Sequence, residues 1–166
     1  TQLVQTPENR ALRLAVMEGL LRAGRPNNAM QVYEQSEADS SLSELQVVAL
    51  LARGRMSEAL ELGQGLVPTQ CEAGPADCAP WLASIGWGTA ASVGLRTMLQ
   101  ERGQWSRTRA DRAALSASLA RVERIRGRKG PEVAAWAQAM QLSPRDAELR
   151  SSYVRALLET GQLGRA

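Results

Sequence analysis

The sequence has no histidine and no phenylalanine, and its only lysine is Lys129. Without histidine, a Ser-His-Asp triad, a Cys-His pair and an imidazole-ligated zinc site are all excluded. Lys129 lies in the run GRKGP, which is typical of an exposed turn and not of a Schiff-base lysine. We therefore expect no catalytic residue, no cofactor and no metal site in this chain, and hence no enzyme activity of its own.

Long apolar runs and phosphate-binding glycine loops are also missing. No stretch of about 18 apolar residues occurs, so we expect no membrane insertion by this segment. Neither GxGxxG nor GxxxxGK[ST] is found, which leaves nucleotide binding unsupported. The 166 residues are 44% hydrophobic and 22% charged, an ordinary composition for a chain that folds.

A repeated helical pattern is present instead. In residues 8–23 apolar side chains recur at helical spacing, and Gly24 separates them from a second segment that begins near Pro26, as is favoured at the start of a helix. The same pattern returns in residues 41–66 and again in residues 146–166. The sequence therefore predicts an all-α protein made of helical hairpins.

Particular residues recur at fixed places in these hairpins. They are Leu20, Gly24, Ala29 and Tyr33; Leu50, Gly54 and Ala59; Trp136, Ala139 and Pro144; and Tyr153, Leu157, Gly161 and Ala166. Gly127 and Gly161 are 34 residues apart. In these features the sequence resembles the tetratricopeptide repeat family, whose unit is a 34-residue helix pair. The resemblance implies a right-handed superhelical solenoid of antiparallel helix pairs, with the small residues and the aromatic residues packed in its core.

The repeats predict one continuous array over residues 1–166. Its repeats are expected near 8–39, 40–68 and 113–146, with a truncated repeat at 147–166 and an irregular insert at 69–112. In the insert, the glycines allow either one helix over about 81–102 or two shorter helices that meet near Gly86–Gly88. Because both ends look like partial repeats, we expect the chain to be a piece of a longer repeat protein.

The family resemblance also implies a concave groove lined by the first helix of each pair. The residues that it places in this groove are Leu14, Glu18, Leu21, Arg22, Glu44, Val48, Leu51, Arg121, Arg124, Ser151, Arg155 and Glu159. The lysine and asparagine clamp that some members use for a partner's terminal carboxylate is not reproduced. We therefore do not expect a receptor for chaperone tails.

The charges are distributed unevenly. From Arg96 to Lys129 the chain has ten basic and three acidic residues, or +7, whereas from Pro26 to Pro80 it has two basic and eight acidic residues, or −6. We expect a basic face that either is simply solvated or contacts a protein or an anionic polymer. Its arginines are Arg96, Arg102, Arg107, Arg109, Arg112, Arg126 and Arg128. Nucleic acid is disfavoured, because Trp105 alone does not provide interleaved aromatic residues.

The only two cysteines, Cys71 and Cys78, lie in the run QCEAGPADCAPW. Their spacing is too wide for a CxxC redox motif, and two ligands are too few for structural zinc. Because they bracket a Gly/Pro turn, we expect a disulfide, with two free thiols as the alternative. A disulfide favours the bacterial periplasm, whereas free thiols would favour the cytoplasm.

These predictions favour a protein interaction scaffold. We expect another protein of the same bacterial envelope assembly as its partner, for example in exopolysaccharide export or in secretion. Two alternatives stay open: a substrate-recruiting segment of an enzyme such as a glycosyltransferase, whose catalytic domain lies elsewhere, and a cytosolic repeat-containing regulator.

Overall fold

The computed structural model describes residues 7–35, 43–62, 69–71, 73–101 and 103–162, and these ranges contain helices and no strand. The α-helices are α1 (Pro7–Arg22), α2 (Pro26–Glu34), α3 (Ser43–Ala52), α4 (Met56–Leu62), α5 (Pro75–Leu82), α6 (Gly88–Gln100), α7 (Arg109–Ile125), α8 (Lys129–Leu142) and α9 (Ala147–Glu159). A 3₁₀ turn, η2 (Thr69–Cys71), precedes α5, and a π-helical turn, η3 (Ala83–Trp87), joins α5 to α6. The predicted all-α class is confirmed.

Local sequence explains where these helices begin. Pro26 and Pro75 occupy the first turns of α2 and α5, where no backbone N–H is needed. At α7, Thr108 and Asp111 form a capping box, in which each side chain accepts a hydrogen bond from the backbone N–H of the other residue. At α9, the side chain of Asp146 accepts hydrogen bonds from two backbone N–H groups of the first turn.

Four helices end in the same way. Gly24, Gly54, Gly127 and Gly161 have φ between 71 and 76°. Each glycine N–H donates to the carbonyl three residues earlier, and the next N–H donates to the carbonyl five residues earlier. This is the Schellman motif, which requires a left-handed residue and therefore favours glycine. The chain therefore turns through the same backbone motif after α1, α3, α7 and α9.

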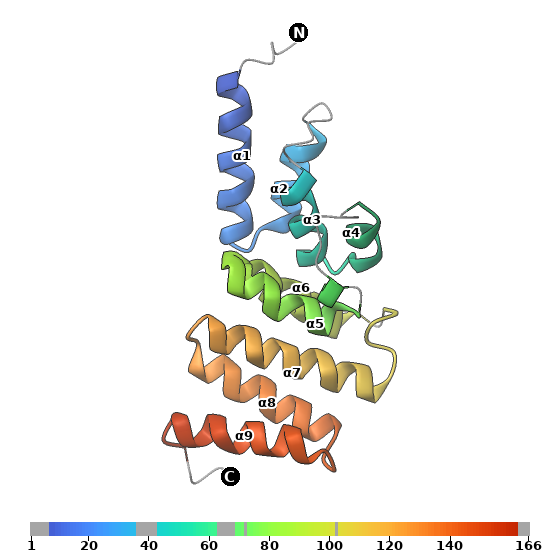
Figure 1. Cartoon of the computed structure of the whole chain (residues 1–166), viewed down its shortest axis with the longest axis vertical. Coiled ribbons are helices and arrows are strands. Elements are labelled where there is room, and N and C mark those ends of the chain that lie inside the picture. Colours follow the sequence, from blue (N-terminus) through green and yellow to red (C-terminus); the bar gives the residue numbers. More distant parts are fainter. Residues whose placement is uncertain (1–6, 36–42, 63–68, 72, 102, 163–166) are drawn as a thin grey trace.

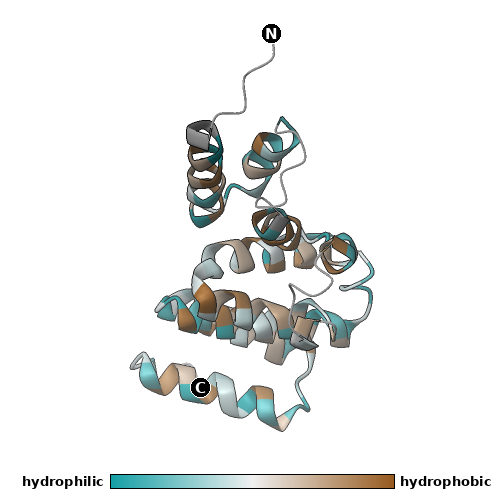
Figure 2. Ribbon diagram, turned by 45° about the horizontal axis from the view of Figure 1, so that its top comes forward, coloured by the Kyte–Doolittle hydropathy of each residue, from teal (hydrophilic) through white to brown (hydrophobic). Residues whose placement is uncertain are grey.

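The elements form an elongated stack (Figure 1). Helices α7, α8 and α9 lie across the long axis as successive layers, whereas α1 runs along that axis at the opposite end. Helix α1 packs on α2, α3 on α4, α7 on α8 and α8 on α9. Figure 2 shows α3, in the middle of the molecule, as a strongly hydrophobic helix, and α3 packs against α6.

Helix α6 joins the two ends of this stack. It contacts α1 and α3 on one side and α5 and α7 on the other. A β-carbon placed on Gly94 would lie 2.4 Å from the carbonyl oxygen of Leu51, so α6 and α3 approach backbone to backbone. Residues 69–112, expected to form an irregular insert, therefore contain the central junction of the fold.

The helix count in this region was open, and the structure has two helices separated by η3. Gly86 has φ 99°, which breaks the helical path between α5 and α6. Helix α7 begins at Arg109, four residues before the expected repeat boundary at 113. The expected boundaries at 39–40 and 68 fall outside the described residues.

The residues predicted to pack are buried. Ala29, Ala59 and Ala139 are fully buried, and Trp136 is 5% exposed. Tyr33 and Tyr153 are partly buried against the same core. In α7, every residue from Leu115 to Ala120 is buried, because α5 and α6 cover one side of this helix and α8 covers the other. Among the described residues, no helix is both long and apolar enough to cross a membrane.

Candidate functional site

The four glycine-capped turns provide an internal alignment that reveals two unusual residues. Four residues before the glycine the chain has Leu20, Leu50, Glu123 and Leu157, and five residues after it Ala29, Ala59, Glu132 and Ala166. Glu123 is fully buried and Glu132 is 4% exposed. Both buried carboxylates therefore occupy places that hold apolar residues at the other turns.

Glu123 is surrounded by hydrogen-bond donors. The Ser92 hydroxyl donates to its Oε1 over 2.6 Å, and Arg96 Nη2 donates to the same oxygen over 3.0 Å. Arg126 Nη1 lies 3.1 Å from both carboxylate oxygens, and Arg128 Nε lies 3.9 Å from Oε2. A buried carboxylate needs such partners, because an unpaired charge in the interior is strongly unfavourable.

Several elements bring these groups together. Gly88, Ser92 and Arg96 lie on one face of α6, four residues apart, and this face meets the end of α7. The Arg126 side chain runs over Gly88, where an added β-carbon would lie 2.8 Å from its Cγ. Nearby, the Arg22 guanidinium stacks on the Trp87 ring at 5.1 Å from the centroid.

The charges around Glu123 do not balance. Burial by itself raises the pKa of Glu123, but the hydrogen bonds from Ser92 and Arg96 and the positive charges of Arg126 and Arg96 outweigh it, so that the pKa lies below its ordinary value. The carboxylate is therefore ionised at neutral pH. Three guanidinium groups and one carboxylate give a local charge of 3 − 1 = +2. The side chains of Arg96 and Arg128 are 48% and 52% exposed, so this charge is presented to solvent.

Glu132 is in a different situation. Its Oε1 is buried without a hydrogen-bond partner among the described residues, and its ion pair with Arg124 is long, at 3.9 Å. Arg124 also pairs with Glu159. Burial raises the pKa of Glu132 and the Glu159 carboxylate raises it further, while Arg124, the Trp136 side chain and Lys129 oppose this only in part.

Replacement of Glu132 by glutamine is therefore expected to stabilise the fold at pH 7. A raised folded-state pKa means that the contribution of Glu132 is most favourable below its unfolded-state pKa and is lost as the pH rises through the folded-state pKa. We expect the melting temperature of Glu132→Gln to exceed that of the wild type by about 2–4 °C at pH 7, the shift caused by roughly 1 kcal/mol in a chain of this size. The difference should shrink as the pH falls through the raised folded-state pKa toward the unfolded-state value, because the wild-type carboxyl is then protonated in the folded protein. A lower melting temperature at pH 7 would contradict the argument.

The predicted groove residues do not share one environment. Leu21, Val48 and Leu51 are 0%, 7% and 5% exposed and belong to the core, so they do not lie at an open surface. Their side chains fill the contacts that α1 and α3 make with neighbouring helices. Leu14 and Glu18 are half-buried. The exposed members of the set are Arg22, Glu44, Arg121, Arg124, Ser151, Arg155 and Glu159.

The arginines of the predicted basic face form two separate groups, one near each end of α7. Arg96, Arg126 and Arg128 meet at Glu123, near the end of this helix. Arg107, Arg109 and Arg112 lie at its start, and Arg112 and Arg126 are 14 residues apart, or about 20 Å along a helix. Arg109 there donates to the carbonyl of Gln141. Arg102 lies outside the described residues.

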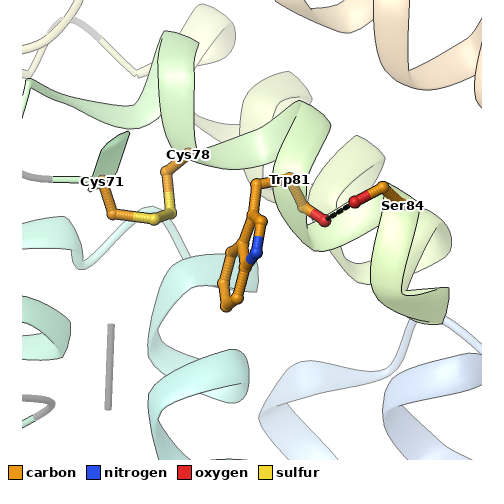
Figure 3. The surroundings of a disulfide bond; sticks show 4 residues. All are labelled: Cys71, Cys78, Trp81 and Ser84. Carbon is orange, nitrogen blue, oxygen red and sulfur yellow. Dashed lines mark hydrogen bonds between the residues drawn. A yellow bond between two sulfur atoms is a disulfide. The ribbon is translucent and has the colours of Figure 1, made fainter. Parts of the chain in front are cut away.

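The two cysteines are paired, as predicted. Their sulfur atoms are 2.09 Å apart, which is the distance of a disulfide, and the pair joins η2 to α5. Cys71 is 0% and Cys78 1% exposed. Figure 3 shows Trp81 on the same side of α5 as Cys78, one turn further along, and the Ser84 hydroxyl donates to the Trp81 carbonyl over 2.7 Å.

Removal of this disulfide is expected to lower stability substantially. The bridge closes a loop of eight residues, since the cysteines are seven positions apart. We expect the double change Cys71→Ala and Cys78→Ala to lower the free energy of unfolding by about 2.5 kcal/mol in the loop-entropy description. Urea denaturation of both proteins would measure this difference. A difference below about 0.5 kcal/mol would show that the junction is held by packing alone.

Comparisons with profiles of protein families, with curated protein sequences and with solved structures found no match. Among the described residues no group of three or more histidine, cysteine or acidic side chains could hold a metal ion. The cluster around Glu123 offers oriented guanidinium groups, whose planar N–H pairs match carboxylate oxygens.

Sequence reasoning missed Glu123, Ser92 and Glu132 as important residues. It treated Glu123 only as one of three acidic residues in a basic segment. A sequence signal for Glu123 and Glu132 was nevertheless present. When the segments around Gly24, Gly54, Gly127 and Gly161 are aligned, the two glutamates occupy positions that are apolar in the other segments. The role of Ser92 had no such signal, because only the packing of α6 on α7 brings it to Glu123.

Proposed function

We propose that this chain is a protein-binding scaffold built as a right-handed superhelical solenoid of antiparallel helix pairs, similar to tetratricopeptide repeats. The observation that carries the proposal is the repetition of one glycine-capped turn at Gly24, Gly54, Gly127 and Gly161. Stacks of such units expose long continuous surfaces, which repeat proteins use to bind other macromolecules. No enzyme activity of this segment is part of the proposal.

The exposed residues of α7 and α9 are the proposed contact surface. Arg121 and Arg124 on α7 and Arg155 and Glu159 on α9 are solvent-accessible and charged. The two helices each pack on α8, so they occupy equivalent places in successive pairs. A partner that lies along the stack would meet both.

Site-specific photo-crosslinking in the source cell tests this proposal. A photoreactive amino acid at Arg121 or Arg155 is expected to give a discrete crosslinked band, which mass spectrometry would identify as another protein. Ala134 on α8, which is exposed and lies on the second helix of its pair, is the matched control and is expected to give none. Equal crosslinking from all three positions, or from none, would reject a specific contact surface.

We also propose that the chain works in the periplasm, as part of an envelope export or secretion assembly. The Cys71–Cys78 pair supports this location, because disulfides persist in oxidising compartments. Both sulfur atoms are buried, so alkylation must be carried out under denaturing, non-reducing conditions. Protein alkylated directly from cells is expected to carry no alkyl group on either cysteine. Two alkylated cysteines would instead support the cytoplasm.

A further inference from the structure

We propose that Arg96, Arg126 and Arg128, oriented by Glu123, bind the carboxylate groups of an acidic segment of a protein partner. This inference deepens the proposed scaffold role and rests on it for the nature of the partner. The segment would carry two or more aspartate or glutamate side chains close together. It would approach from the solvent side of Arg96 and Arg128 and would not contact Glu123 itself.

The excess charge is the first argument. One carboxylate is satisfied by hydrogen bonds from Ser92, Arg96 and Arg126, at 2.6, 3.0 and 3.1 Å. Arg128 adds a third positive charge at 3.9 Å, although Glu123 already has donors on both oxygens. Three guanidinium groups that converge repel one another, so an arrangement with a net charge of +2 is best completed by further carboxylates.

Pre-organisation is the second argument. Glu123 is fully buried and fixes Arg96 and Arg126. These side chains are therefore already ordered before a ligand binds, and binding costs less conformational entropy. Arg96 is fixed twice, because its Nε also donates to the Ser92 hydroxyl over 3.3 Å. The Arg96 side chain, which is 48% exposed, is thereby held in place at the surface. A flexible surface arginine would have to be ordered by the ligand.

The distribution of charge selects a short acidic segment over an anionic polymer. A polymer requires a continuous line of cations, but Arg107, Arg109 and Arg112 lie about 20 Å away at the other end of α7. Between Arg112 and the next arginine, Arg121, α7 carries no basic residue and is buried from Leu115 to Ala120. The local charge of +2 therefore matches one or two ligand carboxylates and not an extended polyanion.

Isothermal titration calorimetry with hexaglutamate as the probe tests the proposal on the purified chain with its disulfide intact. We expect hexaglutamate to bind and hexaglutamine not to bind. The double change Arg96→Gln and Arg128→Gln, at two half-exposed positions, is expected to weaken binding by about tenfold, the loss expected for one or two charge-assisted hydrogen bonds. The matched double change Arg107→Gln and Arg109→Gln should alter binding by less than about twofold, if steering is only local.

Two further measurements separate geometry from charge. The change Arg96→Lys with Arg128→Lys keeps the charge but removes the planar fork, and we expect it also to weaken binding severalfold. Circular dichroism and the melting temperature would show that each variant is folded. The proposal would be overturned if the Arg96/Arg128 double variant and the Arg107/Arg109 double variant weakened hexaglutamate binding equally. It would also be overturned if the protein bound polygalacturonate but not hexaglutamate. If the crosslinks at Arg121 and Arg155 appear but hexaglutamate does not bind, the scaffold role stands and the acidic-segment proposal is rejected.

Discussion

Replacement of Gly94 by alanine is expected to lower the free energy of unfolding by about 3 kcal/mol, at the upper end of overpacking changes. The new methyl group would lie 2.4 Å from the Leu51 carbonyl oxygen and 3.1 Å from the Ala52 Cα, both of which are backbone atoms. Backbone cannot rotate away as a flexible side chain can, so α3 and α6 would have to separate. Urea denaturation would measure the loss, and the contacts between the N-terminal helices and α6 should loosen first in hydrogen exchange.

Gly19 provides the matched control for this change. It lies within α1, and a β-carbon there would meet nothing within 4 Å. Glycine in the middle of a helix is unfavourable relative to alanine, so Gly19→Ala is expected to stabilise the protein by about 0.5–1 kcal/mol. Opposite signs for the same substitution would show that the cost at Gly94 comes from the α3–α6 contact. Equal effects at both positions would refute the α3–α6 contact as the cause of the destabilisation at Gly94.

Replacement of Glu123 by glutamine is the second change with a large expected effect. It leaves Arg96, Arg126 and Arg128 around a neutral amide that also points two N–H donors toward them. Loss of one partner from a buried ion pair typically costs 3–5 kcal/mol, and we expect about 3 kcal/mol here, because two of the arginines are half-exposed and regain water. Thermal and urea denaturation at pH 7 would measure it.

Glu159→Gln is the control, since Glu159 also pairs with an arginine but is 42% exposed. An exposed pair contributes little, so this change should cost less than about 1 kcal/mol. If the two changes had similar effects, the network around Glu123 would be no stronger than a surface pair.

The pH dependence of Glu123 has the opposite sign to that of Glu132. The pKa of Glu123 is lowered in the folded state, so its contribution to stability is complete above its unfolded-state pKa and is lost as the pH falls through its folded-state value. The stability difference between wild type and Glu123→Gln should therefore narrow in acid. A difference that stayed constant down to the lowest pH at which the protein folds would argue against a charged network.

Several residues that carry the tetratricopeptide resemblance lie in turns or in the core, whereas Ala166 lies outside the described residues. Glycine at Gly24, Gly54 and Gly161 could be interpreted from sequence, because a left-handed cap restricts the choice of residue strongly. Ala29 and Ala59 could be predicted as buried, since small residues at fixed spacing are typical of helix contacts. The groove residues Leu21, Val48 and Leu51 could not be placed, because the side of a helix that is covered depends on its neighbours.

The site around Glu123 was less accessible to sequence reasoning. Counting charges found a basic segment, but it could not show that Arg96 and Arg126, 30 positions apart, share one carboxylate. Nor could it show that Arg112 lies at the other end of the same helix. Charge is a property of the residues, whereas a charged site requires that they converge.

The sequence by itself determined the helical class and the glycine turns at Gly24, Gly54 and Gly161, and it favoured a Cys71–Cys78 disulfide over two free thiols, because each depends on local spacing and on backbone conformations that few residues adopt. Only the tertiary structure decided that α6 is the junction, that Gly94 allows backbone contact with α3, and that Glu123 gathers Arg96 from α6 with Arg126 and Arg128 from the turn after α7. These features depend on residues far apart in the chain, whose distances are set by how whole helices pack.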